Sequence, residues 1–580
     1  MARIQKPSGS PAAVLTTLEG TGKKTSKARN TTITITMAVQ QLLYFRIGGF
    51  LEEEEWNQDD FKEQSNDGGP RAHNRSKTTG QIRQDQFYCP EEILVRIGVL
   101  LLLAAVGSGG KVPRTWTDAS VATMEVPLAN AKYSPIHITE KTYYELPTRT
   151  VYQSYPVYHP NREPAGFMQW LERQEPRIAF DPEALKTRRD WIEAGSLVFN
   201  APVSYSPVFF SAKDLRDPSF FERLGMPVAK DGTIPFARWV IRRKGQVELG
   251  SMGCNTCHTR VLPDGTVIPG AQGNNPGDRQ GAAMLRQTAS AGSSAQLLTR
   301  LLRFAKQFEV PWIENDPNRR AQTMSLEELL AAGDAIPPGV TARSHTSMLL
   351  PPQIPDLIGV KDRRFLDHTG LVLHRDIGDL MRYSALVQDA VGLARYREIQ
   401  PEPSTRGSVR YTDEQLYALA LYLYSLTPPK NPNQFSAEAA KGERIFEREG
   451  CAGCHTPPLY TNNKLIPVDG FKPPADHLER FDILLTPVGS DPRYALQTRK
   501  GTGYYKVPSL KGVWYRGPFG HHGSAATLED WLDPARLSNS YRPTGYAGPD
   551  GRERAVKGHE FGLSLSSADR TALIAFLRTL

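Results

Sequence analysis

Two short stretches of this sequence repeat the pattern Cys-x-x-Cys-His, which limits what the chain can fold into more than any other feature. The first, GCNTCHTR, spans residues 253–260, and the second, GCAGCHTP, spans residues 450–457. Together they use four of the five cysteines in the chain. Any fold has to place two thiols and a neighbouring imidazole together at each of these two positions.

Three kinds of site use closely spaced cysteines. A redox dithiol of the thioredoxin type needs no histidine after Cys-x-x-Cys and usually lies in a βαβ context, which this sequence does not show. A structural zinc site needs four ligands close together, whereas Cys451 follows Cys254 by 197 residues and the histidines would have no role. Covalent haem uses every residue of the pattern, because the thiolates add to the vinyl groups and the histidine ligates the iron.

The pattern therefore predicts two covalently bound haem c groups, with zinc or redox dithiols as the alternatives. The predicted attachment residues are Cys254, Cys257, Cys451 and Cys454, and the predicted proximal iron ligands are His258 and His455.

Composition narrows the classes of partner. The chain has 580 residues, enough for two or three domains, and 39% apolar with 23% charged residues is typical of a globular protein. The 48 glycines and 45 prolines indicate long loops. The formal net charge of +8 does not predict nucleic-acid binding, because lysine and arginine are scattered and no recognition motif is present. Four haem propionates would offset about half of that charge.

The N-terminal part of the chain has the features of an export signal in an unusual place. Residues 1–90 are polar, with Glu52–Glu55 in a row, and we predict a non-native or disordered extension. Residues 91–110 contain ILVRIGVLLLLAAVGSGG, which has a basic residue, an apolar run and then small residues. This order predicts a signal peptide or signal anchor, with translation beginning near it; a buried apolar helix is the alternative. We expect a periplasmic or otherwise exported protein, with membrane contact only if the segment is uncleaved, and no role for Cys89.

Two segments are related by a constant offset of 153 residues. IPDLIGVKDRRFLDHTG spans 354–370, and VPSLKGVWYRGPFGHHG spans 507–523. Helical patterns open each unit, at 188–200 and in AEAAKGERIFEREGCAGCH, and close each unit, from Thr412 and up to Leu580. The order predicts a mainly α fold with two tandem cytochrome c-type haem domains, long loops and an N-terminal accessory region.

The predicted domain boundaries follow from this order. Residues 111–180 form the accessory region, and its aromatic segment at 142–160 either lines a pocket or packs over the haem domains. The first cytochrome c domain covers 181–428, with an insertion at about 201–250, and the second covers 429–580.

The segment VPSLKGVWYRGPFGHHGSAATLEDWL, together with both haem motifs, resembles the di-haem cytochrome c peroxidase superfamily over roughly 191–580. The resemblance implies two all-α cytochrome c domains. One haem would take electrons from a small cytochrome or copper protein, and the other would meet the oxidant. The wide motif spacing and the C-terminal KGHEFGLSLSSADRTALIAFLRTL are closer to the rubber-oxygenase branch, where a late histidine ligates the second haem. By this match His559 is the predicted distal ligand of the second haem.

The first haem has no such match. No histidine occurs in VLPDGTVIPGAQGNNPGDRQG after the first motif, and the next one is His345, so we expect an open iron position for peroxide or dioxygen. Cleaving an O–O bond needs a residue that moves a proton. The acidic residue implied by the resemblance falls nearest to Asp379, and His374 is the neighbouring candidate; His368, His521 and His522 are expected at the surface or behind a ligand.

Three functions fit these residues. The first is a peroxidase-type oxidoreductase that reduces hydrogen peroxide. The second is an electron-transfer cytochrome with both irons six-coordinate, which would stay low-spin and react little with peroxide. The third is a di-haem oxygenase acting on an organic substrate, which would consume dioxygen without added peroxide. The superfamily fold hosts several chemistries, so the fold alone does not choose among them.

Overall fold

The computed structural model describes residues 111–205, 209–342, 347, 349–396 and 408–580. These residues all belong to one compact unit, Pro90–Leu580. The extension predicted at 1–90, the signal predicted at 91–110 and His345 lie outside the described residues.

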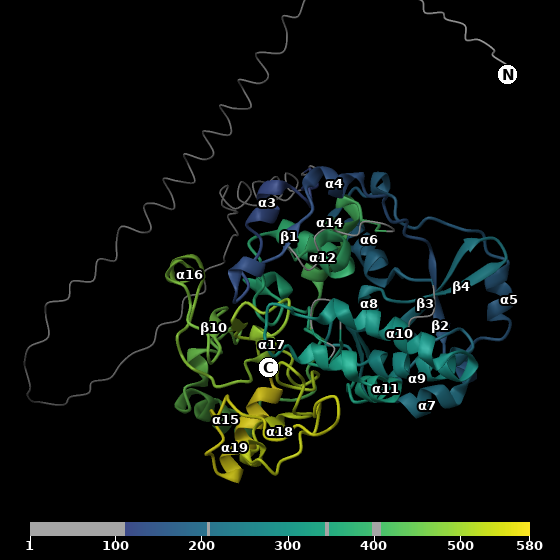
Figure 1. Ribbon diagram of the computed structural model, residues 1–580. Helices are drawn as coiled ribbons and strands as arrows, with labels where there is room; N and C mark the ends of the chain where they lie inside the picture. Colours follow the sequence, from purple (N-terminus) through teal and green to yellow (C-terminus); the bar gives the residue numbers. More distant parts are fainter. Residues whose placement is uncertain (1–110, 206–208, 343–346, 348, 397–407) are drawn as a thin grey trace, which may run out of the picture. The chain divides into compact units, whose positions relative to one another are not determined.

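The described part of the chain is mainly α-helical, with short strands between the helices (Figure 1). The helices are α3 Asp118–Ala122, α4 Glu140–Glu145, α5 Phe167–Glu172, α6 Arg188–Asn200, α7 Pro218–Leu224, α8 Cys254–Cys257, α9 Gly277–Ala291, α10 Ser294–Ala305, α11 Leu326–Asp334, α12 Ile377–Gln388, α13 Ala390–Leu393, α14 Asp413–Ser425, α15 Ala437–Arg448, α16 Ala475–Arg480, α17 Arg493–Leu496, α18 Leu528–Trp531 and α19 Ser567–Arg578. The strands are β1 Ile136–His137, β2 Ser154–Tyr158, β3 Thr233–Arg243, β4 Gln246–Gly250, β5 Thr259–Val261, β6 Val267–Pro269, β7 Phe365–Leu366, β8 Val372–Leu373, β9 Ala394–Arg395, β10 Leu465–Pro467 and β11 Tyr504–Lys506. None of the described helices is long and apolar enough to cross a membrane.

The helices predicted to open and close the first unit, α6 and α14, pack against each other (Figure 1). Each begins with a capping box, in which the cap threonine and the third helical residue bond each other's backbone. Gly195 makes the close approach possible, because a Cβ at this position would lie 2.0 Å from the carbonyl oxygen of Ala418. Beside it, the ring of Phe199 packs on Tyr422, with centroids 5.3 Å apart.

The second unit repeats this crossing with α15 and α19. A Cβ on Gly442 would lie 1.9 Å from the carbonyl oxygen of Ala572, and Phe446 packs on Phe576 with centroids 5.4 Å apart. The glycine and the phenylalanine four residues later thus have the same role in both units. The sequence similarity between the two opening helices therefore reflects one shared way of packing a helix pair.

This crossing predicts a steric effect of a single methyl group. Gly442→Ala is expected to lower the free energy of unfolding by at least about 1–3 kcal/mol, because a backbone carbonyl cannot give way as a flexible side chain can. The matched control is Gly281→Ala in α9, where the nearest atom would be 3.9 Å away and the helix gains propensity. Thermal unfolding of both variants checks this, and equal midpoints would contradict the crossing.

A three-stranded antiparallel sheet, β2–β3–β4, combines the accessory region with the predicted insertion. It positions the first haem motif, because α8 lies against β3. The Asn255 side chain donates to the Pro235 carbonyl at 2.7 Å, and the Thr256 hydroxyl donates to the Phe236 carbonyl at 3.1 Å. Strand β3 of the insertion therefore holds the Cys-x-x-Cys-His turn in place through these two hydrogen bonds.

The accessory region is also paired with the rest of the unit at two places. Glu125 bridges to Val372 of β8, and β1 pairs with β9 in antiparallel register, His137 opposite Ala394. In the aromatic segment, Tyr143 is fully buried and stacks on Trp116 with centroids 4.8 Å apart. The described residues of this segment line neither cavity presented below, so it packs as part of the core.

Candidate functional site

The second Cys-x-x-Cys-His motif opens onto a cavity of about 310 Å³. Cys451, Cys454 and His455 line it, as does His559 from the loop before α19. The His455 Nδ1 atom lies 3.1 Å from the Pro508 carbonyl oxygen and 3.2 Å from that of Tyr460. These contacts assign the proton to Nδ1 and leave Nε2 as the nitrogen available to a metal.

His559 lies close to His455 in the same cavity. The two ring centroids lie 6.3 Å apart with an angle of 59° between the ring planes. Two imidazoles on opposite sides of one metal, each at a metal–nitrogen distance of about 2.0–2.1 Å, place their centroids roughly 6 Å apart. Burial, helped by His455 and Arg536, lowers the pKa of His559 to about 4, so the imidazole is neutral at pH 7 as a metal ligand must be.

The backbone around His559 is held tightly. Its φ of +48° is in the left-handed region, its N–H donates to the Val488 carbonyl at 2.6 Å, and its carbonyl accepts from Arg536 at 2.8 Å. The observed position of this ring therefore depends on a backbone conformation that few non-glycine residues adopt.

The first motif opens onto a larger cavity of about 590 Å³, lined by Cys257 and His258. The His258 Nδ1 atom lies 3.0 Å from the Pro355 carbonyl oxygen. Pro355 and Pro508 are equivalent residues of the repeat at offset 153. The repeated proline thus orients the histidine of both motifs by the same hydrogen bond. Cys254 lies beside the cavity and accepts a contact from the Gln388 amide at 3.6 Å.

The wall of the second cavity contains three partly buried cations and one carboxylate, Asp356. Arg363, Lys506 and Arg516 line it. Their described hydrogen bonds go to backbone carbonyls, among them Lys506 to Phe365 at 3.4 Å, and the Arg516 Nε has no partner among the described residues. Burial lowers the pKa of Lys506 to about 7. Because three cations face a single carboxylate and partly buried charge is costly when unpaired, this wall suits an anionic group such as a haem propionate.

The first cavity has the opposite charge and a broad apolar wall. Its acidic lining residues are Glu125, Asp278, Asp367 and Asp389, and Lys500 forms an ion pair with Asp367 at 2.7 Å. Burial raises the pKa of Asp278 to about 7. Helices α9, α10 and α11 contribute apolar side chains that include Leu285, Leu301, Phe304, Leu329 and Leu330.

Three residues, Gln353, Pro355 and His368, line both cavities. His368 is partly buried, its Nε2 lies 2.6 Å from the Gln353 carbonyl oxygen, and desolvation lowers its pKa to about 4. His368 is therefore not the surface residue that a histidine in a long loop suggests. His521 and His522 form a cluster with Asp491. Two nitrogens of Arg493 already donate to the Asp491 carboxylate.

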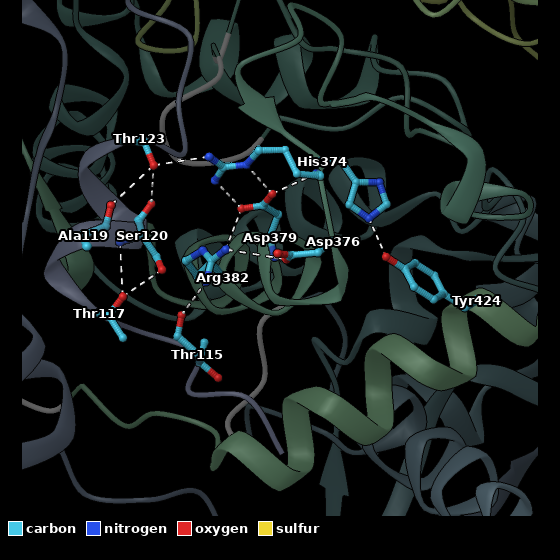
Figure 2. Close-up of polar contacts among 11 residues, drawn as sticks. Thr115, Thr117, Ala119, Ser120, Thr123, His374, Asp376, Asp379, Arg382 and Tyr424 are labelled. Carbon is cyan, nitrogen blue, oxygen red and sulfur yellow. Dashed lines mark hydrogen bonds and ion pairs between the residues drawn. The ribbon is translucent and has the colours of Figure 1, made fainter. Parts of the chain in front are cut away.

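Asp379 and His374 line neither cavity. Asp379 belongs to a network with Arg375 and Arg382, whereas the His374 side chain makes separate contacts (Figure 2). Burial alone would raise the pKa of Asp379, but Arg375 and Arg382 outweigh it and lower the pKa to about 2. His374 is bonded at both ring nitrogens, to the Arg363 carbonyl at 2.7 Å and to the Tyr424 hydroxyl at 2.6 Å.

This network joins α12 to the N-terminal segment. Arg382 donates to the Thr115 carbonyl at 3.3 Å, and Arg375 donates to the Thr123 hydroxyl at 3.3 Å (Figure 2). Asp379 is thus held by two arginines and does not line the cavity that contains His258. The sequence search missed Glu125 and His137, which do line the first cavity, because no motif marks either of them.

These features define a class of protein. It is a mainly α protein with two Cys-x-x-Cys-His sites, each of which opens onto a cavity and has its histidine oriented by a repeated proline. The chain is similar to cytochrome-c peroxidase IdrP1 of Denitromonas iodatirespirans, with 30% identity over 113 residues. That match covers 16% of this chain and 30% of the relative, so the chain spans less than a third of the relative's length. No protein-family model matches the chain.

Two solved structures are also similar. One is Kuenenia stuttgartiensis hydrazine synthase, at 18% identity and a TM-score of 0.26, covering 48% of this chain and 87% of that one. The other is a MauG-like protein associated with microbial copper homeostasis, at 18% identity and a TM-score of 0.27, covering 47% and 91%. TM-scores this low carry no argument about fold or function.

Proposed function

We propose that this chain is an exported di-haem c-type cytochrome that reduces hydrogen peroxide, an oxidoreductase of the cytochrome c peroxidase type. Cys254, Cys257 and His258 would hold one haem, and Cys451, Cys454, His455 and His559 the other. The observation that carries the proposal is the asymmetry of the two cavities. In the second cavity two imidazoles lie 6.3 Å apart between ring centroids, a spacing that suits two ligands of one iron, whereas the first cavity has nearly twice the volume.

Each bound haem would supply an iron that gains or loses one electron. The residues around the two cavities would then have different functions, electron transfer at one and oxidant binding at the other. Two strong ligands and a cationic wall would favour uptake and release of electrons at the second cavity, where a small cytochrome or copper protein would be the donor. The first cavity leaves room for a small oxidant beside His258. The partial similarity to a cytochrome-c peroxidase supports the proposed class of reaction.

The experiment uses the holoprotein reduced by two electrons and mixed anaerobically with one equivalent of hydrogen peroxide. We expect both haems to be oxidised, with one peroxide consumed for every two electrons. Stopped-flow optical spectroscopy measures the oxidation of the haems over time. A pure electron carrier would stay reduced over the same time, which would refute the proposal. A protein inactivated by bleaching of its haem would also refute it.

One observation favours the oxygenase as a second candidate. The apolar side chains of α9, α10 and α11 extend the first cavity beyond what a peroxide molecule needs, and Phe304 at 45% exposure lies where this wall meets solvent. Pockets with a broad apolar lining and few polar groups bind organic molecules. Dioxygen consumption that depends on an apolar organic substrate, without added peroxide, would support this candidate instead.

A further inference from the structure

Two residues of the N-terminal accessory region, Glu125 and His137, form a buried ion pair in the wall of the first cavity. The His137 Nε2 lies 3.1 Å from the Glu125 Oε2, and their side chains are 6% and 14% exposed. Both line the same cavity as His258. They come from a part of the chain that precedes both repeated units, so nothing in the repeat predicts them.

Backbone pairing fixes both residues. The neighbours of Glu125 bond the strand that contains Val372: the Val126 N–H donates to the Leu371 carbonyl at 2.7 Å, and the Leu373 N–H donates to the Met124 carbonyl at 2.8 Å. On the other side, His137 lies opposite Ala394 in the β1–β9 pair. An ion pair held by two separate strand pairings has little freedom, as a group that moves a proton in a fixed direction requires.

The state of His137 suits proton transfer. Burial lowers its pKa, but the charge and hydrogen bond of Glu125 outweigh burial, and the net shift is upward from the ordinary value. Both ring nitrogens are shielded from solvent, and apart from the ion-pair contact of Nε2 with Glu125 neither has a partner among the described residues. Trp116 contacts the ring edge-on at a centroid distance of 6.0 Å and shields it from one side. The imidazole can therefore hold a proton next to the cavity and release it.

We propose that the Glu125–His137 pair is the acid–base group of the first cavity. The inference rests on the proposed peroxide reduction, in which H₂O₂, two electrons and two protons give two water molecules as the O–O bond breaks. His137 accepts a proton from one peroxide oxygen and returns it to the oxygen that leaves as water, with Glu125 holding the imidazolium. The two net protons come from solvent, and the electrons come from the external redox protein.

The other acids of the cavity are less suited to this role. Asp367 is already held by Lys500 at 2.7 Å and by the Tyr383 hydroxyl at 2.9 Å. These contacts keep the pKa of Asp367 well below its ordinary value despite burial, so it does not take up a proton near neutral pH. Asp389 caps α13 by accepting the Gly392 N–H at 3.0 Å. Asp278 is the stronger competitor, because burial raises its pKa to about 7.

The test compares two small ligands of the first haem in the holoprotein. Hydrogen cyanide has to lose a proton as it binds ferric iron, whereas carbon monoxide binds ferrous iron with no proton transfer. His137→Gln is expected to slow cyanide association by roughly 100-fold or more, the contribution typical of one acid–base group, and to leave carbon monoxide association within about twofold. Glu125→Gln is expected to act in the same direction. His477→Gln is the matched control, since His477 is buried, bonds Tyr504 at 2.9 Å and lines neither cavity.

Each outcome decides the inference. Equal slowing of both ligands would mean that the pair only shapes the cavity and would overturn it. Unchanged cyanide association, or slowing in Asp278→Asn and not in His137→Gln, would assign the proton to another group and also overturn it. A wild-type protein that binds no cyanide would refute the open iron position on which the proposed function depends, and the inference with it. If peroxide is not reduced but His137→Gln still slows cyanide alone, the acid–base role stands without the peroxidase function.

Discussion

Replacing both cysteines of one motif is expected to remove one covalent haem and leave the other. Cys451→Ala with Cys454→Ala should yield a chain with a single haem attached through Cys254 and Cys257. The reason is that a thioether to each vinyl group is what keeps a c-type haem bound when the protein is denatured. The complementary pair, Cys254→Ala with Cys257→Ala, should retain the haem of the second motif. Each change therefore halves the covalent haem per chain.

The measurement is the mass of the denatured chain, together with haem content determined after denaturation. Cys89→Ala is the control, because it removes the one cysteine outside the two motifs, and it should leave two haems. A wild-type chain that retains no haem after denaturation, or one that contains zinc, would refute the cofactor prediction. A variant that folds poorly still reports on attachment, because mass is read on the denatured chain.

Local sequence patterns predicted the parts of the site that depend on local structure. The two histidines after the cysteines open onto cavities, and the repeat at offset 153 marks the prolines, Pro355 and Pro508, whose carbonyls contact them. The helices that open and close each unit are present as well, because caps and apolar spacing are encoded within a dozen residues. The assignment of iron ligands, including His559, stays a prediction that the geometry supports.

Residues that depend on distant partners were not predictable in this way. Asp379 has the right chemical type for acid–base work, but only the fold shows that Arg375 and Arg382 already bind it. The reverse applies to His137, which has no motif and enters the first cavity only because β1 pairs with β9, more than 250 residues later in the chain. The cations that line the second cavity are likewise scattered along the chain, from Arg363 to Arg516. Charge type alone does not reveal which groups share a low-dielectric wall.

The second large effect expected concerns the spin state of the second haem. His559→Ala should convert it from low-spin to high-spin in the ferric state, because the variant lacks the imidazole that faces His455 at a centroid distance of 6.3 Å. Low-temperature EPR of the ferric holoprotein, before and after addition of one electron, would show one low-spin signal lost and a high-spin signal gained. His559→Met tests the same position without leaving it empty: a thioether ligand keeps the iron low-spin and raises its reduction potential.

His477→Ala is the control, and it should change neither the spectrum nor the potential. If the wild-type second haem is already high-spin, or if His559→Ala leaves its low-spin signal intact, another residue ligates the iron. In that case the tight backbone around His559 only positions the loop before α19.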